Sequence, residues 1–365
     1  MTTLVCATAL ALALTGCSGG SSTTSSSLTS GAIPVPTTPV PASLTLSETG
    51  SSLMAPLFAG WRSAYQSRFP QVTLRTATSS SGTGIMSAAT GRTDIGASNA
   101  YLSPADVTKY TDLVNIPLAV AALMVIYNVP GLSPSAHLKL NGAVLAQIFA
   151  GKITSWSDPA IRSLNPGVGL PGRAIVLVHR SDSSGSTFLF TSYLNAQDPA
   201  DWSSSLIGTK VTWPQQPGEL GASGSSMMIS TVKGAPGSVG YVGVSYLTTV
   251  TQDHEGEVAL GNSAGNYVLP TASTIQAALA SFTNTPTNEA ISLINGSAAQ
   301  AYPIINYEYA IVNTSQPSVT LAQDLRAFLT WAINAGTAQL AKVNFQPLPQ
   351  STAVLSQAQI AQIRG

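Results

Sequence analysis

The chain has 365 residues, more than a single hydrophobic core usually organises, so we expect two lobes rather than one small domain. Apolar residues make up 44% and charged residues 8% of the sequence, a balance that excludes a disordered chain. Fifteen basic residues balance fifteen acidic ones without any basic run, so we expect no nucleic-acid partner. An anionic ligand would have to be held by local dipoles and one or two charges.

The first segment is typical of an exported protein. Residues 1–16 form an apolar run that is shorter than the roughly 20 residues of a membrane span. The sequence Leu14-Thr15-Gly16-Cys17 resembles a bacterial lipobox, in which the signal peptide (1–16) is removed and the cysteine thiol receives lipid. No basic residue precedes the apolar run, as one ordinarily would, and a plain secretory segment with an incidental cysteine is the alternative.

Residues 17–43 are rich in Ser, Thr and Gly and then in Pro, which predicts a flexible tether between a membrane surface and a folded body. The only other cysteine, Cys6, lies in the segment that would be removed, so we expect no disulfide. We therefore expect an exported protein, lipid-anchored to the cell membrane or free in the periplasm.

After the tether, apolar strand-like runs alternate with segments of helical period, which predicts an α/β architecture. The predicted strands are Ser43–Leu46, Val72–Thr76, Val114–Pro117, Ala121–Tyr127, Ile175–His179, Val239–Val244 and Ile304–Val312. The predicted helices are Pro56–Phe69, Ile85–Thr90, Gly142–Phe149, Ser186–Leu194 and Leu321–Ala335. No segment of this body approaches the length of a membrane span.

Three loops crowded with Ser and Gly precede helical segments: Gly50–Ser52, Ser79–Gly84 and Arg180–Thr187. The first backbone N–H groups of a helix have no partner within the helix, and the helix dipole adds positive charge there, so such loops favour an oxyanion. Ser and Thr are also ordinary N-caps, which gives each loop a purely structural explanation. Three such loops, one of them beside an arginine, favour the binding explanation.

Six segments, in this order, resemble those of the phosphate-binding protein of the Pst-type ABC importer, a class of periplasmic binding protein. They are Gly50–Pro56 with Trp61, Ser81-Gly82, Thr93–Ala100, Ile148–Trp156, Arg180–Phe188 and Pro236–Val242. The resemblance covers the chain from about Leu44 to its end and implies the two-lobed α/β fold of type II periplasmic binding proteins. It implies lobe 1 from 44–119 and 300–365, and lobe 2 from 120–299, joined by hinge strands around a ligand cleft.

The resemblance also implies roles for single residues. Ser52 and Leu53 would supply contacts from the first loop, Ser81 a hydroxyl and a backbone N–H, and Arg180 the cationic contact. The start of the next helix would contribute Ser184, Gly185 and Ser186, while Asp182 would orient Arg180 and Gly82 would support the second loop.

Directed donors fit phosphate, whose four oxygens carry one to two negative charges at neutral pH. In the family, an acidic side chain accepts the proton that phosphate retains and sulfate lacks. Asn99 takes that place here. We expect phosphate to remain the ligand, with looser rejection of sulfate or arsenate, and a binder of another oxyanion such as sulfate or molybdate is an alternative.

An enzyme is the other alternative class. Gly261-Asn262-Ser263-Ala264-Gly265 matches the nucleophile elbow of serine hydrolases, but it lies between two apolar runs that predict a hairpin or loop. An exported phosphatase is a further alternative, although no activated nucleophile is visible. The histidines at 137, 179 and 254 lack metal-ligand spacing, so we expect no metal, cofactor or catalysis. The expected partners are inorganic phosphate and the permease and ATPase subunits of an ABC importer, and we expect a monomer.

Overall fold

The computed structural model describes residue 39 and residues 43–365. The predicted signal peptide, Cys17 and all of the predicted tether except residues 39 and 43 lie outside the described residues. Within the described part, no helix has both the length and the apolar character needed to cross a membrane.

The strands are β1 (Leu44–Ser51), β2 (Val72–Ser79), β3 (Ile95–Ser98), β4 (Leu113–Asn128), β5 (Lys139–Leu140), β6 (Val176–Arg180), β7 (Leu220–Ala222), β8 (Ser238–Gly243), β9 (Gly256–Glu257), β10 (Ala259–Gly261), β11 (Tyr267–Val268), β12 (Leu293–Ile294) and β13 (Ile304–Asn313). The α-helices are α1 (Ala55–Arg68), α2 (Ser81–Ala89), α3 (Pro104–Lys109), α4 (Gly142–Phe149), α5 (Pro159–Leu164), α6 (Gly185–Gln197), α7 (Gly224–Gly234), α8 (Leu247–Gln252), α9 (Ala272–Leu279), α10 (Val319–Ile333) and α11 (Gln350–Ala361). Four 3₁₀ segments are η1 (Pro134–Ala136), η2 (Ser204–Leu206), η3 (Val244–Tyr246) and η4 (Ala335–Val343).

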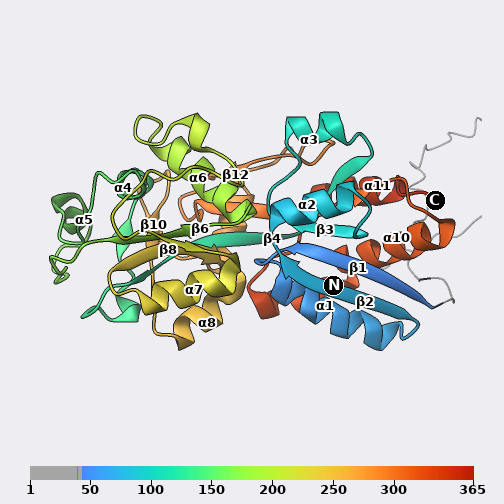
Figure 1. Cartoon of the computed structure of the whole chain (residues 1–365), viewed down its shortest axis with the longest axis horizontal. Coiled ribbons are helices and arrows are strands. Elements are labelled where there is room, and N and C mark those ends of the chain that lie inside the picture. Colours follow the sequence, from blue (N-terminus) through green and yellow to red (C-terminus); the bar gives the residue numbers. More distant parts are fainter. Residues whose placement is uncertain (1–38, 40–42) are drawn as a thin grey trace, which may run out of the picture. The chain divides into compact units, whose positions relative to one another are not determined.

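The main sheet has the strand order β2-β1-β3-β13-β4-β8-β6-β7. Strand β4 joins its two halves, because residues 113–122 pair with β13 and residues 123–128 pair with β8. Figure 1 shows β4 running through the middle, with α1, α2, α3, α10 and α11 around one half and α4 to α8 around the other. The two halves therefore share a continuous strand, as expected of lobes connected by hinge strands.

The sequence predicted two strands where β4 is one. The first predicted strand ends at Pro117, which has no N–H to donate to a ladder. The structure accommodates it at a bulge: Tyr309 pairs with Pro117 and Glu308 with Ala119, so Leu118 is the extra residue. Nearly all of β4 is buried, which explains its continuous apolar sequence.

Within each half, the strands that matter for the site run parallel. β1 pairs in parallel with β2 and β3, and β6 pairs in parallel with β7 and β8. The carboxyl ends of parallel neighbours meet at one edge of a sheet, where open α/β sheets bind ligands. The predicted binding loops follow β1, β2, β3 and β6 at these ends.

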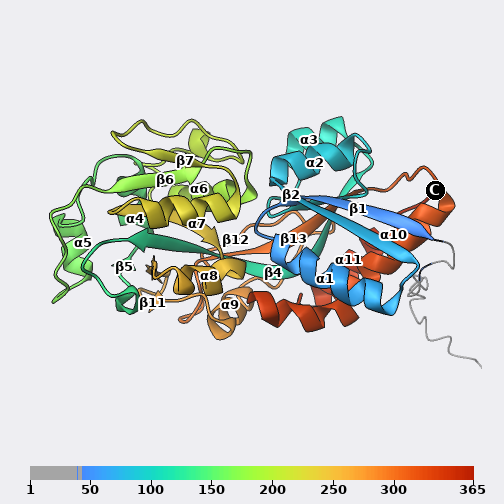
Figure 2. The ribbon, with the colours of Figure 1, turned by 60° about the horizontal axis from the view of Figure 1, so that its bottom comes forward.

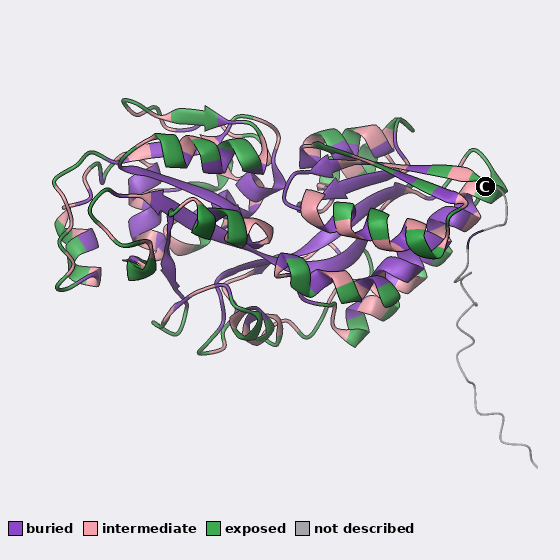
Figure 3. Ribbon diagram, turned by 90° about the horizontal axis from the view of Figure 1, so that it is seen from below, coloured by how far each residue is buried: buried purple, intermediate pink, exposed green. Residues whose placement is uncertain are grey.

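Helices cover the sheet so that apolar side chains from each half form a packed core. In the first half, an aromatic group consists of Phe58, Trp61, Tyr65, Phe328 and Trp331. The corresponding group in the second half consists of Phe149, Phe190, Trp202, Trp213 and Tyr241. Figure 3 shows buried strands beneath helices whose outer faces are exposed, the arrangement that gives amphipathic helices their stability.

Candidate anion-binding site

Three of the predicted residues follow strand ends in the first half of the sheet. Ser52 comes directly after β1, and Asn99 comes directly after β3. Ser81 is the second residue after β2 and the first residue of α2. All three are buried. Helix α2 begins earlier than predicted, because Ser80 caps it by accepting the N–H of Thr83 at 3.2 Å.

Asn99 connects these loops with the second half of the sheet. Its Oδ1 accepts the hydroxyl protons of Ser51 at 2.9 Å and Ser81 at 2.8 Å. Its Nδ2 donates to Ser186 Oγ at 3.0 Å, on the first turn of α6. Since an amide oxygen has two lone pairs, both acceptor positions of Asn99 are already occupied by hydroxyls.

The second half contributes Arg180 and the start of α6. The Arg180 side chain is 3% exposed and makes two bonds to the Asp182 carboxylate, from Nε at 2.7 Å and from Nη2 at 2.5 Å. This bidentate pair fixes the guanidinium plane. The backbone N–H of Arg180 donates to Tyr241 Oη at 3.2 Å, and burial raises the pKa of Tyr241 to about 12, so the phenol stays neutral.

Helix α6 begins at Gly185, with Ser184 as its N-cap: the Ser184 hydroxyl accepts the N–H of Ser186 at 3.1 Å. Ser186 therefore receives one bond from Asn99 and keeps its own hydroxyl proton to donate. Helix starts from both halves, α2 and α6, thus point their dipoles toward the same region.

Glycine is needed where the two helix starts approach each other. A Cβ on Gly185 would lie 2.6 Å from Asn99 Oδ1 and 2.7 Å from Ser81 Oγ. On the other side, the Gly82 N–H donates to the Ser183 carbonyl at 2.9 Å, and a Cβ on Gly82 would lie 2.2 Å from Ser183 Oγ. A side chain at either position would push the halves apart.

Ser52 and Leu53 also contact the second half. Ser52 Oγ lies 2.9 Å from Ser225 Oγ, and the Ser52 carbonyl accepts the Tyr246 hydroxyl at 2.9 Å. The Leu53 carbonyl accepts the Ser245 hydroxyl at 2.7 Å, and a Cβ on Gly243 would lie 2.2 Å from Leu53 Cγ. Sequence reasoning missed Ser225; its only local signal is the run of small residues Gly221–Ser226.

The arrangement brings the predicted polar residues into two largely buried hydrogen-bonded groups, which adjoin in the chain at Ser51 and Ser52. Ser81, Asn99 and Ser186 are directly linked, while Arg180, Asp182 and Ser52 are linked through the start of α7, where the Gly224 N–H donates to Asp182 Oδ1 at 3.4 Å. Chemically it offers hydroxyl and backbone donors, two helix starts and one guanidinium whose charge is balanced by Asp182. These groups suit a small oxyanion.

Comparison with known proteins agrees with this chemistry. A family model described as a PBP superfamily domain matches residues 35–335. A phosphate-binding protein PstS from Xylella fastidiosa is 31% identical over 352 residues, which cover 95% of this chain and 93% of that protein. This chain belongs to the family of PstS phosphate-binding proteins. A phosphate-binding protein PstS from Pasteurella multocida is 30% identical over 318 residues, covering 86% of this chain and 89% of that protein.

Solved structures with the same fold include proteins described as binding phosphate. A phosphate-binding protein from Stenotrophomonas maltophilia has a TM-score of 0.66 at 21% identity, covering 86% of this chain and 93% of its own. A phosphate ABC transporter substrate-binding protein from Clostridium perfringens, solved with bound phosphate, has a TM-score of 0.60 at 18% identity, covering 84% and 100%. The predicted family and two-lobed α/β fold are both confirmed.

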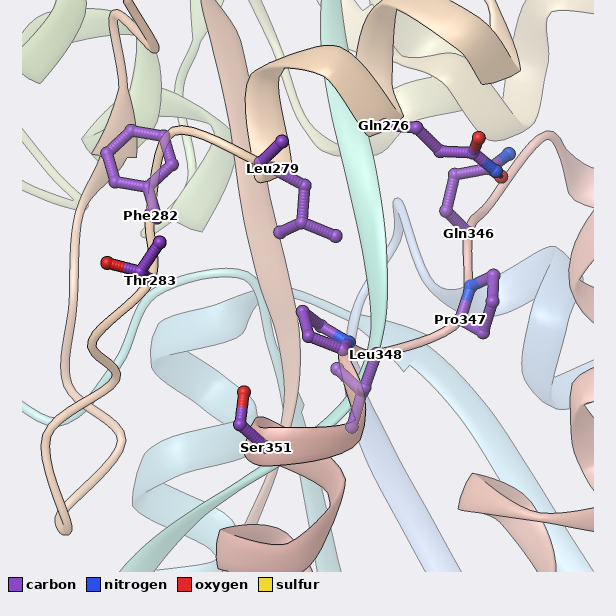
Figure 4. A pocket seen from close by; sticks show the side chains of 10 residues that line it. Gln276, Leu279, Phe282, Thr283, Gln346, Pro347, Leu348 and Ser351 are labelled. Carbon is purple, nitrogen blue, oxygen red and sulfur yellow. Dashed lines mark hydrogen bonds between the residues drawn. The ribbon is translucent and has the colours of Figure 1, made fainter.

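A cavity of about 540 Å³ adjoins the hydrogen-bonded group of Ser81, Asn99 and Ser186. It is lined by residues of both halves, among them Gly82, Ala100 and Ser183, and reaches Lys210 and Asp106. A second cavity, of about 450 Å³, lies between α9 and residues 346–351, where the Gln276 and Gln346 side chains meet at 2.9 Å (Figure 4). Figure 2 places α9 beside the C-terminal part of the chain. No charged residue lines the second cavity within the described chain.

The residues considered for other chemistry lie elsewhere. Ser263 lies in a turn between β10 and β11, which pair antiparallel, so the predicted hairpin is confirmed and the strand-to-helix elbow of a hydrolase is absent at this position. Its hydroxyl donates to the Gly296 carbonyl at 3.0 Å. Across residues 43–365, no three His, Cys, Asp or Glu side chains are grouped so as to hold a metal ion.

Proposed function

We propose that this chain is an extracytoplasmic solute-binding protein that captures inorganic phosphate and delivers it to an ABC importer. Membership of the PstS family supports this function. The observation that carries the proposal is the link from Asn99 to both Ser81 and Ser186, which joins the starts of α2 and α6 across the two halves. An anion held at these starts would be enclosed from both sides.

We propose that the anion contacts are Ser52, Leu53, Ser81, Asn99, Arg180, Ser184, Gly185 and Ser186, supported by Asp182 and Gly82. The lobes would be 44–119 with 300–365, and 120–299, hinged at β4 and β13. Contacts from both lobes exist only when the cleft is closed, so the ligand stabilises the closed form by its differential affinity. No covalent step is required.

Selectivity depends on Asn99. Its Oδ1 is occupied by Ser51 and Ser81, so it has no lone pair left for the proton of phosphate, while one Nδ2 proton remains to donate. A donor-rich site without a carboxylate acceptor also suits a fully ionised oxyanion. We therefore propose that phosphate is bound with looser rejection of sulfate, and another oxyanion such as sulfate or molybdate is the second candidate ligand.

The ligand is tested by isothermal titration of protein that has been unfolded, dialysed and refolded to remove bound anions. Saturable binding of one phosphate per chain supports the proposal, and absence of phosphate binding by the folded protein contradicts it. A sulfate affinity within about tenfold of the phosphate affinity supports loosened selectivity, and strict rejection of sulfate contradicts it. Native mass spectrometry of untreated protein gives an independent readout, since a retained anion adds its own mass.

We propose that the mature protein is a monomer anchored by lipid on Cys17, from which it meets the permease and ATPase subunits of the importer. The lipobox-like sequence Leu14–Cys17 supports the anchor. Replacement of Cys17 by serine should release the protein from the membrane fraction of expressing cells. Retention of the Cys17→Ser protein in that fraction would contradict the anchor while leaving the binding function untouched.

A further inference from the structure

The first turn of α7 forms two long-range hydrogen bonds to the proposed site, one to an anion contact and one to a supporting residue. The N–H of Ser225 donates to Ser52 Oγ at 3.0 Å, and the N–H of Gly224 donates to Asp182 Oδ1 at 3.4 Å. The N-cap of this helix, Ser223, makes no side-chain capping bond. Two of the N–H groups that a helix start leaves unpaired are therefore used to hold one residue from each side of the cleft.

Ser225 adds its side chain to this arrangement. Its Oγ lies 2.9 Å from Ser52 Oγ, both serines are 2% exposed, and they are separated by 173 positions in the chain. Buried hydroxyl groups ordinarily have hydrogen-bond partners, so the contact between Ser52 and Ser225 constrains the direction in which each hydroxyl proton points.

A serine hydroxyl has one proton to donate and two lone pairs that accept. Ser52 Oγ already accepts the N–H of Ser225. If Ser225 also donates its hydroxyl proton, both lone pairs of Ser52 are filled, and the proton of Ser52 is left to point at a third partner. A bound anion, which needs donors, favours this arrangement over the reverse one.

We infer that Ser225 is a positioning residue for anion binding, which acts through Ser52 by fixing that hydroxyl as a donor. The inference rests on the proposed function, because it takes Ser52 as an anion contact. Ser225 does not touch the anion itself. The bond from Gly224 to Asp182 places the same helix start behind the Arg180 guanidinium, so α7 connects the two sides of the cleft.

A double-mutant cycle measured by phosphate titration tests the inference. Ser225→Ala removes the hydroxyl but keeps the backbone N–H, and we expect phosphate affinity to fall by about three- to tenfold, the usual worth of one neutral hydrogen bond. Ser52→Ala should lower affinity further, and the double variant Ser52→Ala/Ser225→Ala should bind no more weakly than Ser52→Ala alone. Ser225→Thr, which keeps the hydroxyl, should restore most of the affinity.

Ser230→Ala is the matched control, because Ser230 lies on the same helix, is exposed, and bonds only within its own turn through the Met227 carbonyl and sulfur. It should bind phosphate like the wild type. Equal affinity of Ser225→Ala and Ser230→Ala would overturn the inference, and so would effects of Ser52→Ala and Ser225→Ala that multiply in the double variant. Failure of the proposed function is distinguishable, since the wild type would then not bind phosphate at all.

Discussion

Replacement of Asn99 by aspartate should restore discrimination against sulfate. The side chain is 1% exposed and accepts the hydroxyls of Ser51 and Ser81, bonds that a carboxylate would keep and strengthen. Its second oxygen would take the place of Nδ2, so Ser186 would turn its proton toward the carboxylate and away from the anion. The site would then contain a negatively charged carboxylate with a lone pair free to accept a proton from the anion.

The size of the effect follows from Coulomb's law. Two unit charges about 4 Å apart repel by about 4 kcal/mol at an effective dielectric constant of about 20. Sulfate has no proton to relieve this repulsion, so its affinity should fall by at least about thirtyfold, which corresponds to about 2 kcal/mol. Phosphate can donate its proton to the carboxylate in a charge-assisted bond worth about 1.5–3 kcal/mol, so its affinity should change by less than about fivefold.

Isothermal titration of both anions at pH 7 measures the ratio of the two affinities for the wild type and Asn99→Asp. Asn288→Asp is the control for added charge, because Asn288 is exposed and its Oδ1 acceptor for the Ala290 N–H would be retained. A phosphate-to-sulfate ratio that stays the same in Asn99→Asp would refute the assignment of Asn99 as the selectivity position. The reasoning would also fail if the wild type already rejected sulfate strictly.

Three further substitutions test the site and the fold. Arg180→Lys should weaken phosphate binding in the same titration by at least about tenfold, because lysine cannot keep two bonds to Asp182 and also face the anion. An unchanged affinity would show that the Arg180 guanidinium does not contact the anion. Gly185→Ala should abolish tight binding, because the new Cβ would lie 2.6 Å from Asn99 Oδ1, and wild-type affinity would show that the halves need not approach this closely. Glu308 is fully buried, neither oxygen has a partner among the described residues, and burial raises the pKa of its carboxyl well above the usual value. The stability that this carboxyl contributes is therefore complete below about pH 4.5 and is lost as pH rises toward the raised folded-state pKa, by up to about 1.4 kcal/mol per pH unit. Thermal unfolding should show Glu308→Gln gaining on the wild type between pH 5 and pH 8, and a constant difference over that range would count against a protonated Glu308.

The sequence predicted the elements whose signals are local. Helix α4 begins and ends at the predicted residues, Gly142 and Phe149, because Asn141 caps an unbroken apolar helical pattern. Helix α6 begins within one residue of the prediction for the same reason, with Ser184 as its cap. Small polar residues before a helix therefore predicted where these helices begin and, with them, the proposed binding loops.

Features that depend on distant partners were not predictable in this way. The bulge that lets Pro117 sit inside β4 is visible only against its partner strand, β13. Ser225 has no local pattern that distinguishes it from Ser226 or Ser230, and its contact with Ser52 spans 173 positions. Long-range pairing of this kind depends on the topology of the fold, which a single sequence does not reveal residue by residue.

Asn99 stands where the family resemblance implies a carboxylate, and its geometry shows how an amide fits there: its oxygen accepts two bonds, and Nδ2 makes one and keeps one proton for a ligand. A carboxylate offers only acceptors, whereas the amide accepts from Ser51 and Ser81 in its own half and donates to Ser186 in the other. The amide carries no charge that would repel a fully ionised anion, and it keeps a ligand-independent bond between the halves, which a carboxylate could also form by accepting the Ser186 proton. We therefore expect Asn99→Asp to change anion selectivity without breaking the contact between Ser186 and residue 99, because Ser186 can donate to the carboxylate.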